Sequence, residues 1–109
     1  MGSVNTKTAI TLFGLAIVLV AVSLPLYLGK IKQNNFYGFR IRKAFESEEN
    51  WFLINRFGAK ALMWWSAVIV AAGIACFYSA PQYVLLIANV TFLSLLVPIV
   101  ITIFYARTL

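Results

Sequence analysis

The sequence predicts an all-α integral membrane protein with three transmembrane helices and a basic loop. Of its 109 residues, 62% are hydrophobic and only 11% are charged, and a chain this short cannot bury so large an apolar fraction away from water. Three apolar stretches, residues 9–28, 61–80 and 83–106, are each as long as the roughly 20 residues that a helix needs to cross a bilayer. Three segments cannot close a barrel, so the spans are helices of a single membrane domain.

The first span, residues 9–28, contains no ionisable side chain except Tyr27. It is longer than the apolar core of a secretory signal peptide, and it ends at Pro25 and a basic loop instead of a small-residue cleavage site. We therefore expect this segment to remain in the mature protein.

The second and third spans are predicted to be antiparallel neighbours, because only residues 79–82 separate them and Pro81 suits the first turn of a helix. One face of the third span is predicted to meet the other helices, and Asn89 points away from it. That face holds Thr91, Ser94, Pro98, Thr102 and Tyr105. In the second span, small residues recur every four positions and allow another helix to approach closely: Ala67, Ala71, Ala75 and Ser79.

The loop between the first two spans, residues 29–60, carries a net charge of +4. It holds seven of the nine Lys/Arg residues and all three acids, whereas residues 79–82 carry no charge. Lys/Arg-rich loops stay on the cytoplasmic side, so we expect the N-terminus outside and both the loop and the C-terminus in the cytoplasm of a plasma-membrane protein. The loop is also expected to attract anionic lipid headgroups.

Within this loop, Ser47 followed by Glu48 and Glu49 is typical of a helix N-terminus, with Ser47 as the N-cap. The apolar residues that follow predict a short amphipathic helix that lies at the interface and runs into the second span, with a bend at Gly58. We expect three tryptophans, at positions 51, 64 and 65, to lie at headgroup level.

The loop also carries a pattern of unrelated residue types at fixed spacing. It consists of Asn34-x-x-Tyr37-Gly38-Phe39-Arg40, then Ser47-x-Glu49-x-Trp51, then Asn55-Arg56 shortly before Gly58. This pattern resembles the loop signature of the SdpI family of bacterial membrane proteins. The resemblance implies a small, stand-alone member of a family whose named proteins protect a cell from a secreted peptide toxin. In at least one case, such a protein also captures a transcriptional repressor at the membrane.

Two interpretations of the loop residues remain open. In the first they bind a ligand or partner, and the candidate residues are Asn34, Tyr37, Gly38, Arg40, Ser47, Glu49, Trp51, Asn55 and Arg56. In the second they form a clamp that folds the loop under the helices, in which Arg40 pairs with Glu49 and Trp51 covers the pair from the bilayer side. The same residue types serve both purposes, so the sequence does not separate the two.

Composition excludes several classes of function. The chain has no His, no Asp and one cysteine, Cys76, so a His-based catalytic triad, a zinc finger and a disulfide framework are excluded, and no metal or cofactor is expected. No Asp, Glu, Lys, Arg or His lies within a span, which leaves a proton relay without a side chain. No nucleic-acid motif accompanies the basic charge.

We therefore expect binding instead of catalysis, and the candidate partners are a peptide toxin, a cytoplasmic repressor and further copies of the chain. One alternative is a subunit of an oligomeric channel or transporter. Another is an enzyme that uses Tyr37, Arg40 and Glu49 at headgroup level, although no nucleophile with an adjacent base is present.

The predicted orientation can be tested by labelling single cysteines in intact cells. Because the +4 loop should lie in the cytoplasm, a membrane-impermeant reagent should leave a cysteine at Gln33 or Asn50 unlabelled and should label one at Gln82. Labelling of the loop from outside would reverse the orientation.

Overall fold

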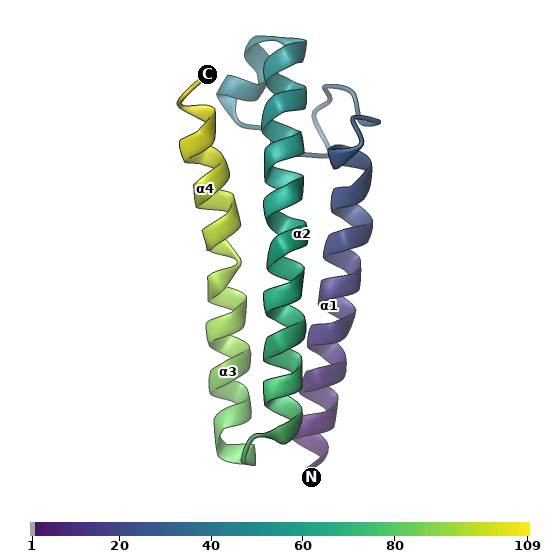
Figure 1. Ribbon diagram of the computed structural model, residues 1–109, viewed down its shortest axis with the longest axis vertical. Helices are drawn as coiled ribbons and strands as arrows, with labels where there is room; N and C mark the ends of the chain where they lie inside the picture. The colour runs from purple at the N-terminus through teal and green to yellow at the C-terminus, as the bar shows by residue number, and fades with distance from the viewer. Residues whose placement is uncertain (1) are drawn as a thin grey trace.

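The computed structural model describes residues 2–109. Its three long helical stretches lie side by side (Figure 1). The described elements are α1 (Ser3–Tyr27), the short 3-10 helix η1 (Arg42–Glu46), α2 (Glu48–Tyr78), α3 (Pro81–Ser94) and α4 (Leu96–Ala106). Three helical stretches are long and apolar enough to span a membrane, and α3 and α4 together make the third. The described residues include no strand. The predicted three-span, all-α fold is confirmed.

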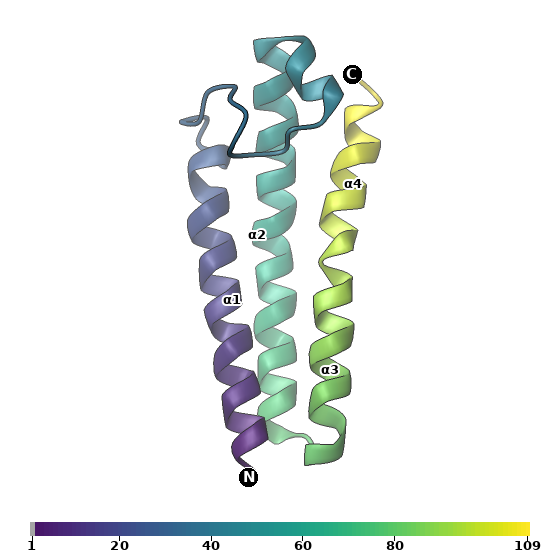
Figure 2. The same cartoon turned by 180° about the vertical axis from the view of Figure 1, so that it is seen from behind.

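The central rod is α2, with α1 on one side and α3–α4 on the other (Figures 1 and 2). Close contact between α1 and α2 depends on Gly73, since a Cβ atom there would lie 2.6 Å from the ring of Phe13. Further along the same interface Leu12, Ala16 and Ile69 are buried in one apolar cluster. A glycine opposite a large ring lets the two backbones approach, which is how helices associate where lipid removes the hydrophobic driving force.

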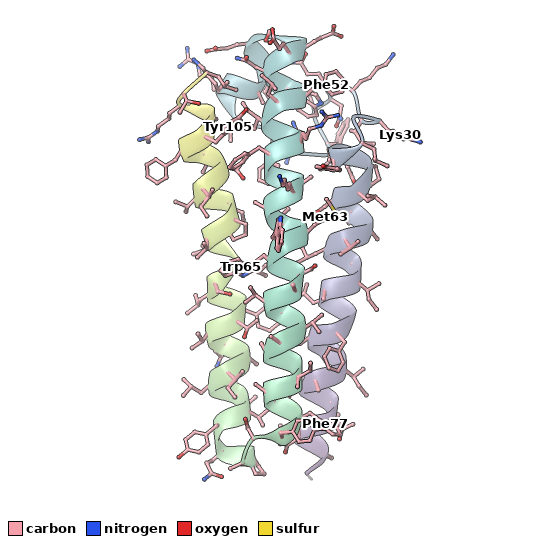
Figure 3. All side chains as sticks on the ribbon, viewed as in Figure 1. Lys30, Phe52, Met63, Trp65, Phe77 and Tyr105 are labelled. Carbon is pink, nitrogen blue, oxygen red and sulfur yellow. The ribbon has the colours of Figure 1, made fainter. Side chains whose placement is uncertain are left out.

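The third span packs against α2 through aromatic side chains and hydroxyls. The rings of Phe57 and Tyr105 stack with centroids 4.2 Å apart, and Figure 3 shows Tyr105 on the side of α4 that faces α2. Lower in the same interface, Trp65 Nε1 donates to Ser94 Oγ at 3.0 Å. The polar face predicted for this span is confirmed: Thr91, Pro98 and Thr102 are buried, Ser94 and Tyr105 are half-buried, and Asn89 is exposed.

The expectation of close helix packing along the small-residue stripe of α2 needs correction. No helix of the described chain packs along the small-residue stripe, because Ala67, Ala71 and Ala75 are exposed. The α1 helix packs instead on the side of α2 that carries Ile69 and Gly73.

The predicted amphipathic helix does run into the second span, and Ser47 caps it by accepting a hydrogen bond from the Asn50 amide at 2.9 Å. It does not lie flat at the interface, however, because α2 continues without a break through Gly58 (Figure 1). Trp51 is also no headgroup anchor: it is fully buried beneath the loop, whereas Trp64 is 71% exposed.

At the opposite end of the molecule, Asn5 connects α1 to the end of α2. Its side chain is buried, and its amide nitrogen donates to the carbonyl of Cys76 at 2.8 Å and to that of Ser79 at 2.7 Å. These carbonyls belong to the last turn of a helix, where the backbone has no partners of its own. Asn5 therefore supplies hydrogen-bond donors to the carbonyls at the end of α2 and holds the start of α1 against that end.

Asn5→Ala is expected to lower the free energy of unfolding by about 1–3 kcal/mol, because it leaves two helix-end carbonyls without their donor. The measurement is unfolding of the purified protein in mixed detergent micelles. Thr6→Ala, at the exposed neighbouring position, is the matched control and should change stability little; equal effects of the two substitutions would contradict this role for Asn5.

Candidate functional site

The loop begins where α1 ends at a left-handed glycine. Gly29 has φ +72°, its amide donates to the Leu26 carbonyl at 3.2 Å, and the Lys30 amide donates to the Pro25 carbonyl at 3.0 Å. This bonding pattern is a Schellman C-cap, which glycine adopts without a steric cost. Arg56 Nε on α2 donates to the carbonyl of Tyr27 at 3.1 Å, so a cation is also placed at the negative end of α1.

Asn34 organises the turn that follows. Its Oδ1 atom accepts hydrogen bonds from the amides of Phe36 at 2.8 Å and Tyr37 at 2.7 Å, and its Nδ2 atom donates to the carbonyls of Lys32 and Tyr37. An asparagine side chain can replace a backbone partner in this way, which is why the residue favours turns. The hydroxyl of Tyr37 donates to the Val22 carbonyl and so ties the turn to α1.

Gly38 lies directly against α2. Its φ is +114°, and a Cβ atom at this position would lie 2.6 Å from Asn55 Oδ1 and 3.2 Å from the ring of Trp51. Both the backbone conformation and the space exclude a side chain here. Asn55 Oδ1 accepts from the Phe39 amide at 2.6 Å, while Asn55 Nδ2 donates to the Trp51 carbonyl at 2.9 Å. One buried amide thus joins the loop to α2.

Two aromatic rings complete this arrangement. Trp51 Nε1 donates to the Ile31 carbonyl at 2.9 Å, and the ring of Phe39 occupies the space above Gly58, where any Cβ atom would overlap it. We use the name loop clamp for the residues that hold the loop on α1 and α2: Asn34, Tyr37, Gly38, Phe39, Trp51 and Asn55. Their geometry supports the clamp interpretation of the loop pattern.

The predicted pairing of Arg40 with Glu49 is wrong. In the described part of the chain the ion pair is Lys43–Glu46, at 3.5 Å. The Arg40 guanidinium donates instead to the carbonyl of Asn35, and Glu49 lies exposed in the first turn of α2 without a hydrogen bond within residues 2–109. Arg40 is held within the loop by its bond to Asn35, and Trp51 turns inward beneath the loop instead of covering a pair.

Beside the loop clamp, a groove lies between α1 and α4 at the loop end of the molecule. Figure 2 shows the loop crossing in front of α2 from the end of α1 toward α4. A cavity of about 430 Å³ lies between the two helices, with Leu62 of α2 at its base and the loop above it. Its lining is apolar: Leu19, Val22, Leu26, Phe36, Tyr37, Gly38, Phe39, Leu62, Leu95 and Ile99.

A second cavity of about 530 Å³ adjoins the first, since Gly38, Phe39 and Ile99 line both. This second cavity also contains Asn35, Arg40, Ile41 and Phe45. We call the two together the α1–α4 groove. One end is apolar and faces the membrane, and the other end carries a guanidinium.

Most of the chain, including the loop, matches a known family. The family model described as the SdpI/YfhL protein family matches residues 30–103, which include the loop, α2, α3 and most of α4. The chain belongs to the SdpI/YfhL family. No curated protein and no solved structure matches the chain. As an SdpI/YfhL member with three apolar spans, it is a multi-pass membrane protein.

The structure divides the nine candidate residues of this SdpI/YfhL chain into two groups. Seven of them hold the loop or cap a helix: Asn34, Tyr37, Gly38, Ser47, Trp51, Asn55 and Arg56. Arg40 and Glu49 remain exposed, and of these two only Arg40 lines the groove.

Among the residues that line the groove, sequence reasoning named only Tyr37, Gly38 and Arg40 as site candidates, and two of those it missed are Phe36 and Ile99. Phe36 is 90% exposed at the tip of the loop and lines the groove, a large apolar side chain presented to the surroundings. Ile99 lies in both cavities. Phe36 stands inside the recognised pattern, where an unpaired aromatic could have been noticed, whereas nothing distinguishes Ile99 from the other apolar residues of its span.

Asn55→Ala is expected to lower the free energy of unfolding by about 1–3 kcal/mol, since it leaves the Phe39 amide without an acceptor and opens a space under the loop. Arg40→Gln and Glu49→Gln should each change it by less than about 0.5 kcal/mol, and their effects should add, because the residues do not touch. Unfolding in mixed micelles is measured for the unaltered protein, the three single variants and the Arg40→Gln/Glu49→Gln double variant. A coupling energy between Arg40 and Glu49 would contradict the structure.

Proposed function

We propose that this SdpI/YfhL protein binds a membrane-active peptide toxin and thereby protects the cell, acting by binding and not by catalysis. The observation that carries the proposal is the α1–α4 groove: an apolar cavity between two membrane helices that ends at an exposed arginine. A toxin that reaches the protein through the bilayer meets the groove directly, without first entering water.

The groove suits an amphipathic segment. Apolar side chains of the ligand would fill the space between α1 and α4, where transfer from water stabilises burial by about 25 cal/mol per Å² of apolar surface. A carboxylate of the ligand would meet Arg40, whose guanidinium has donors free beyond its one bond to the Asn35 carbonyl. Phe36 stands at the opening, exposed and available for contact.

The loop clamp supports this function because it keeps part of the groove wall rigid. Its hydrogen bonds fix Gly38 and Phe39, which form part of the groove wall. A wall fixed before the ligand arrives reduces the ordering cost of binding. In this proposal the motif residues of the clamp act by positioning, and Phe36, Arg40 and Ile99 make the contacts.

A second contact, with a cytoplasmic partner such as a repressor, is favoured by Glu49. This motif residue is exposed in the first turn of α2 and has no partner in residues 2–109, and it lies outside the groove. With the loop in the cytoplasm, as its charge predicts, Glu49 would face the soluble partner while the groove faces the membrane.

The test is to express the chain in a toxin-sensitive bacterium, challenge the cells with membrane-active peptide toxins, and record survival beside the amount of protein in the membrane. Ile99→Trp should fill the groove and abolish protection at normal abundance, and Arg40→Gln should reduce it. Ile101→Trp, on the lipid-exposed side of the same helix, and Arg107→Gln are the matched controls and should protect like the unaltered protein.

Two results would overturn the proposal. If the unaltered chain protects against none of the toxins, toxin immunity is wrong, and solute or ion flux through reconstituted vesicles becomes the measurement for the channel alternative. If Ile99→Trp and Arg40→Gln both protect normally, the protein acts somewhere other than the α1–α4 groove. Asn55→Ala should lose abundance and protection together, as a folding variant does.

A further inference from the structure

Asn89 is a polar side chain that faces the hydrocarbon. It lies on α3, eight residues after the helix begins at Pro81, which places it roughly 12 Å along the span at 1.5 Å per residue. Its side chain is exposed and makes no hydrogen bond within residues 2–109. The side chain is too short to reach the headgroups from that depth.

The other polar side chains of the third span avoid this exposure. Thr91, Ser94 and Thr102 each donate to a carbonyl of the preceding turn, at 2.7, 2.6 and 2.7 Å respectively. All three also face the other helices. The span has a second exposed amide, Gln82, but it lies in the first turn of α3, whereas Asn89 lies two turns further into the span with two donors and an acceptor unpaired. An amide left unpaired in hydrocarbon is costly, so it needs a partner from outside the described chain.

The surroundings of Asn89 form a regular apolar seam. Exposed residues occur alternately three and four positions apart along α3 and α4, and we call this set the Asn89 face: Leu86, Asn89, Leu93, Leu96, Val100 and Ile103. On a helix of 3.6 residues per turn it lies opposite the buried side that carries Thr91, Pro98 and Thr102. This spacing is that of a heptad seam, in which apolar side chains of two helices interlock and one asparagine fixes their register.

We infer that the chain associates with a second copy of itself through the Asn89 face, with the two Asn89 amides hydrogen-bonded to each other. An amide carries both donor and acceptor, so the same residue on an identical helix is its complement. Because the loop charges set the orientation of insertion, all copies have the same orientation in the membrane. The α3 helices of two copies are then parallel, and Asn89 of one lies opposite Asn89 of the other. The α1–α4 groove lies on other residues and remains free.

The experiment uses the full chain carrying Cys76→Ala, reconstituted into lipid vesicles, with one new cysteine and mild oxidation. Leu93→Cys, in the seam and 68% exposed, should form disulfide-linked dimers several-fold more than Val90→Cys, which is 57% exposed but lies about a quarter turn away. Ala71→Cys, on the exposed small-residue stripe of α2, is a second control. Equal cross-linking at the three positions would overturn the inference.

The amide is tested separately by energy transfer between labelled copies at fixed lipid ratio. Asn89→Leu should weaken association by roughly five-fold or more, whereas Asn89→Gln, which keeps an amide, should retain most of it. Asn89 is exposed and makes no hydrogen bond within residues 2–109, so helicity and abundance should be unchanged. Association that survives Asn89→Leu at full strength, or a chain that stays monomeric at every lipid ratio, would overturn the inference.

Discussion

The position of the whole loop depends on one buried amide, that of Asn55. It accepts from the loop at Phe39 and donates to the helix at Trp51, so its two bonds belong to two different elements. The loop has no regular structure between Gly29 and Ile41, and its backbone groups must find partners one by one. Asn55 and Asn34 supply several of them. Without these amides, the part of the groove wall that Gly38 and Phe39 form would have no fixed place.

Glycines make this arrangement compact. Gly38 lets the loop lie on Asn55 and Trp51, Gly58 leaves room for the ring of Phe39, and Gly73 leaves room for Phe13 between the spans. In each case the absence of a Cβ atom leaves room for a larger neighbouring group, as expected where helices associate by close packing and not by expulsion of water. The same device thus serves the helix interface within the membrane and the loop at its edge.

Much of this fold could be predicted from the sequence because the bilayer imposes it. The length of the apolar stretches predicted the three spans, Ser47 predicted the start of α2, and the polar side of the third span predicted its buried face. These features depend on local composition and helical periodicity, which one sequence displays directly.

The site could be predicted only in part. The motif identified the loop residues, but their roles depend on distant contacts: Trp51 with Ile31, and Arg40 with Asn35 in place of Glu49. The types of two residues can suggest a charge pair, but the sequence does not give the distance between their side chains. Ile99 lines the groove only because α4 lies opposite α1. The periodicity of a helix does not predict which other helix lies opposite it.

The interruption of the third span at Leu95 gives the groove one adjustable wall. Pro98 has no amide hydrogen, so the backbone hydrogen bond that would join it to Ser94 is missing, and α3 ends there before α4 begins. The wall that carries Ile99 is therefore the one with the weakest connection to the rest of its span, while α1 and α2 run unbroken. A small tilt of α4 at this break would change the width of the groove while α1 and α2 keep their places, so the size of the space beside the loop is set by the shortest α-helix of the bundle.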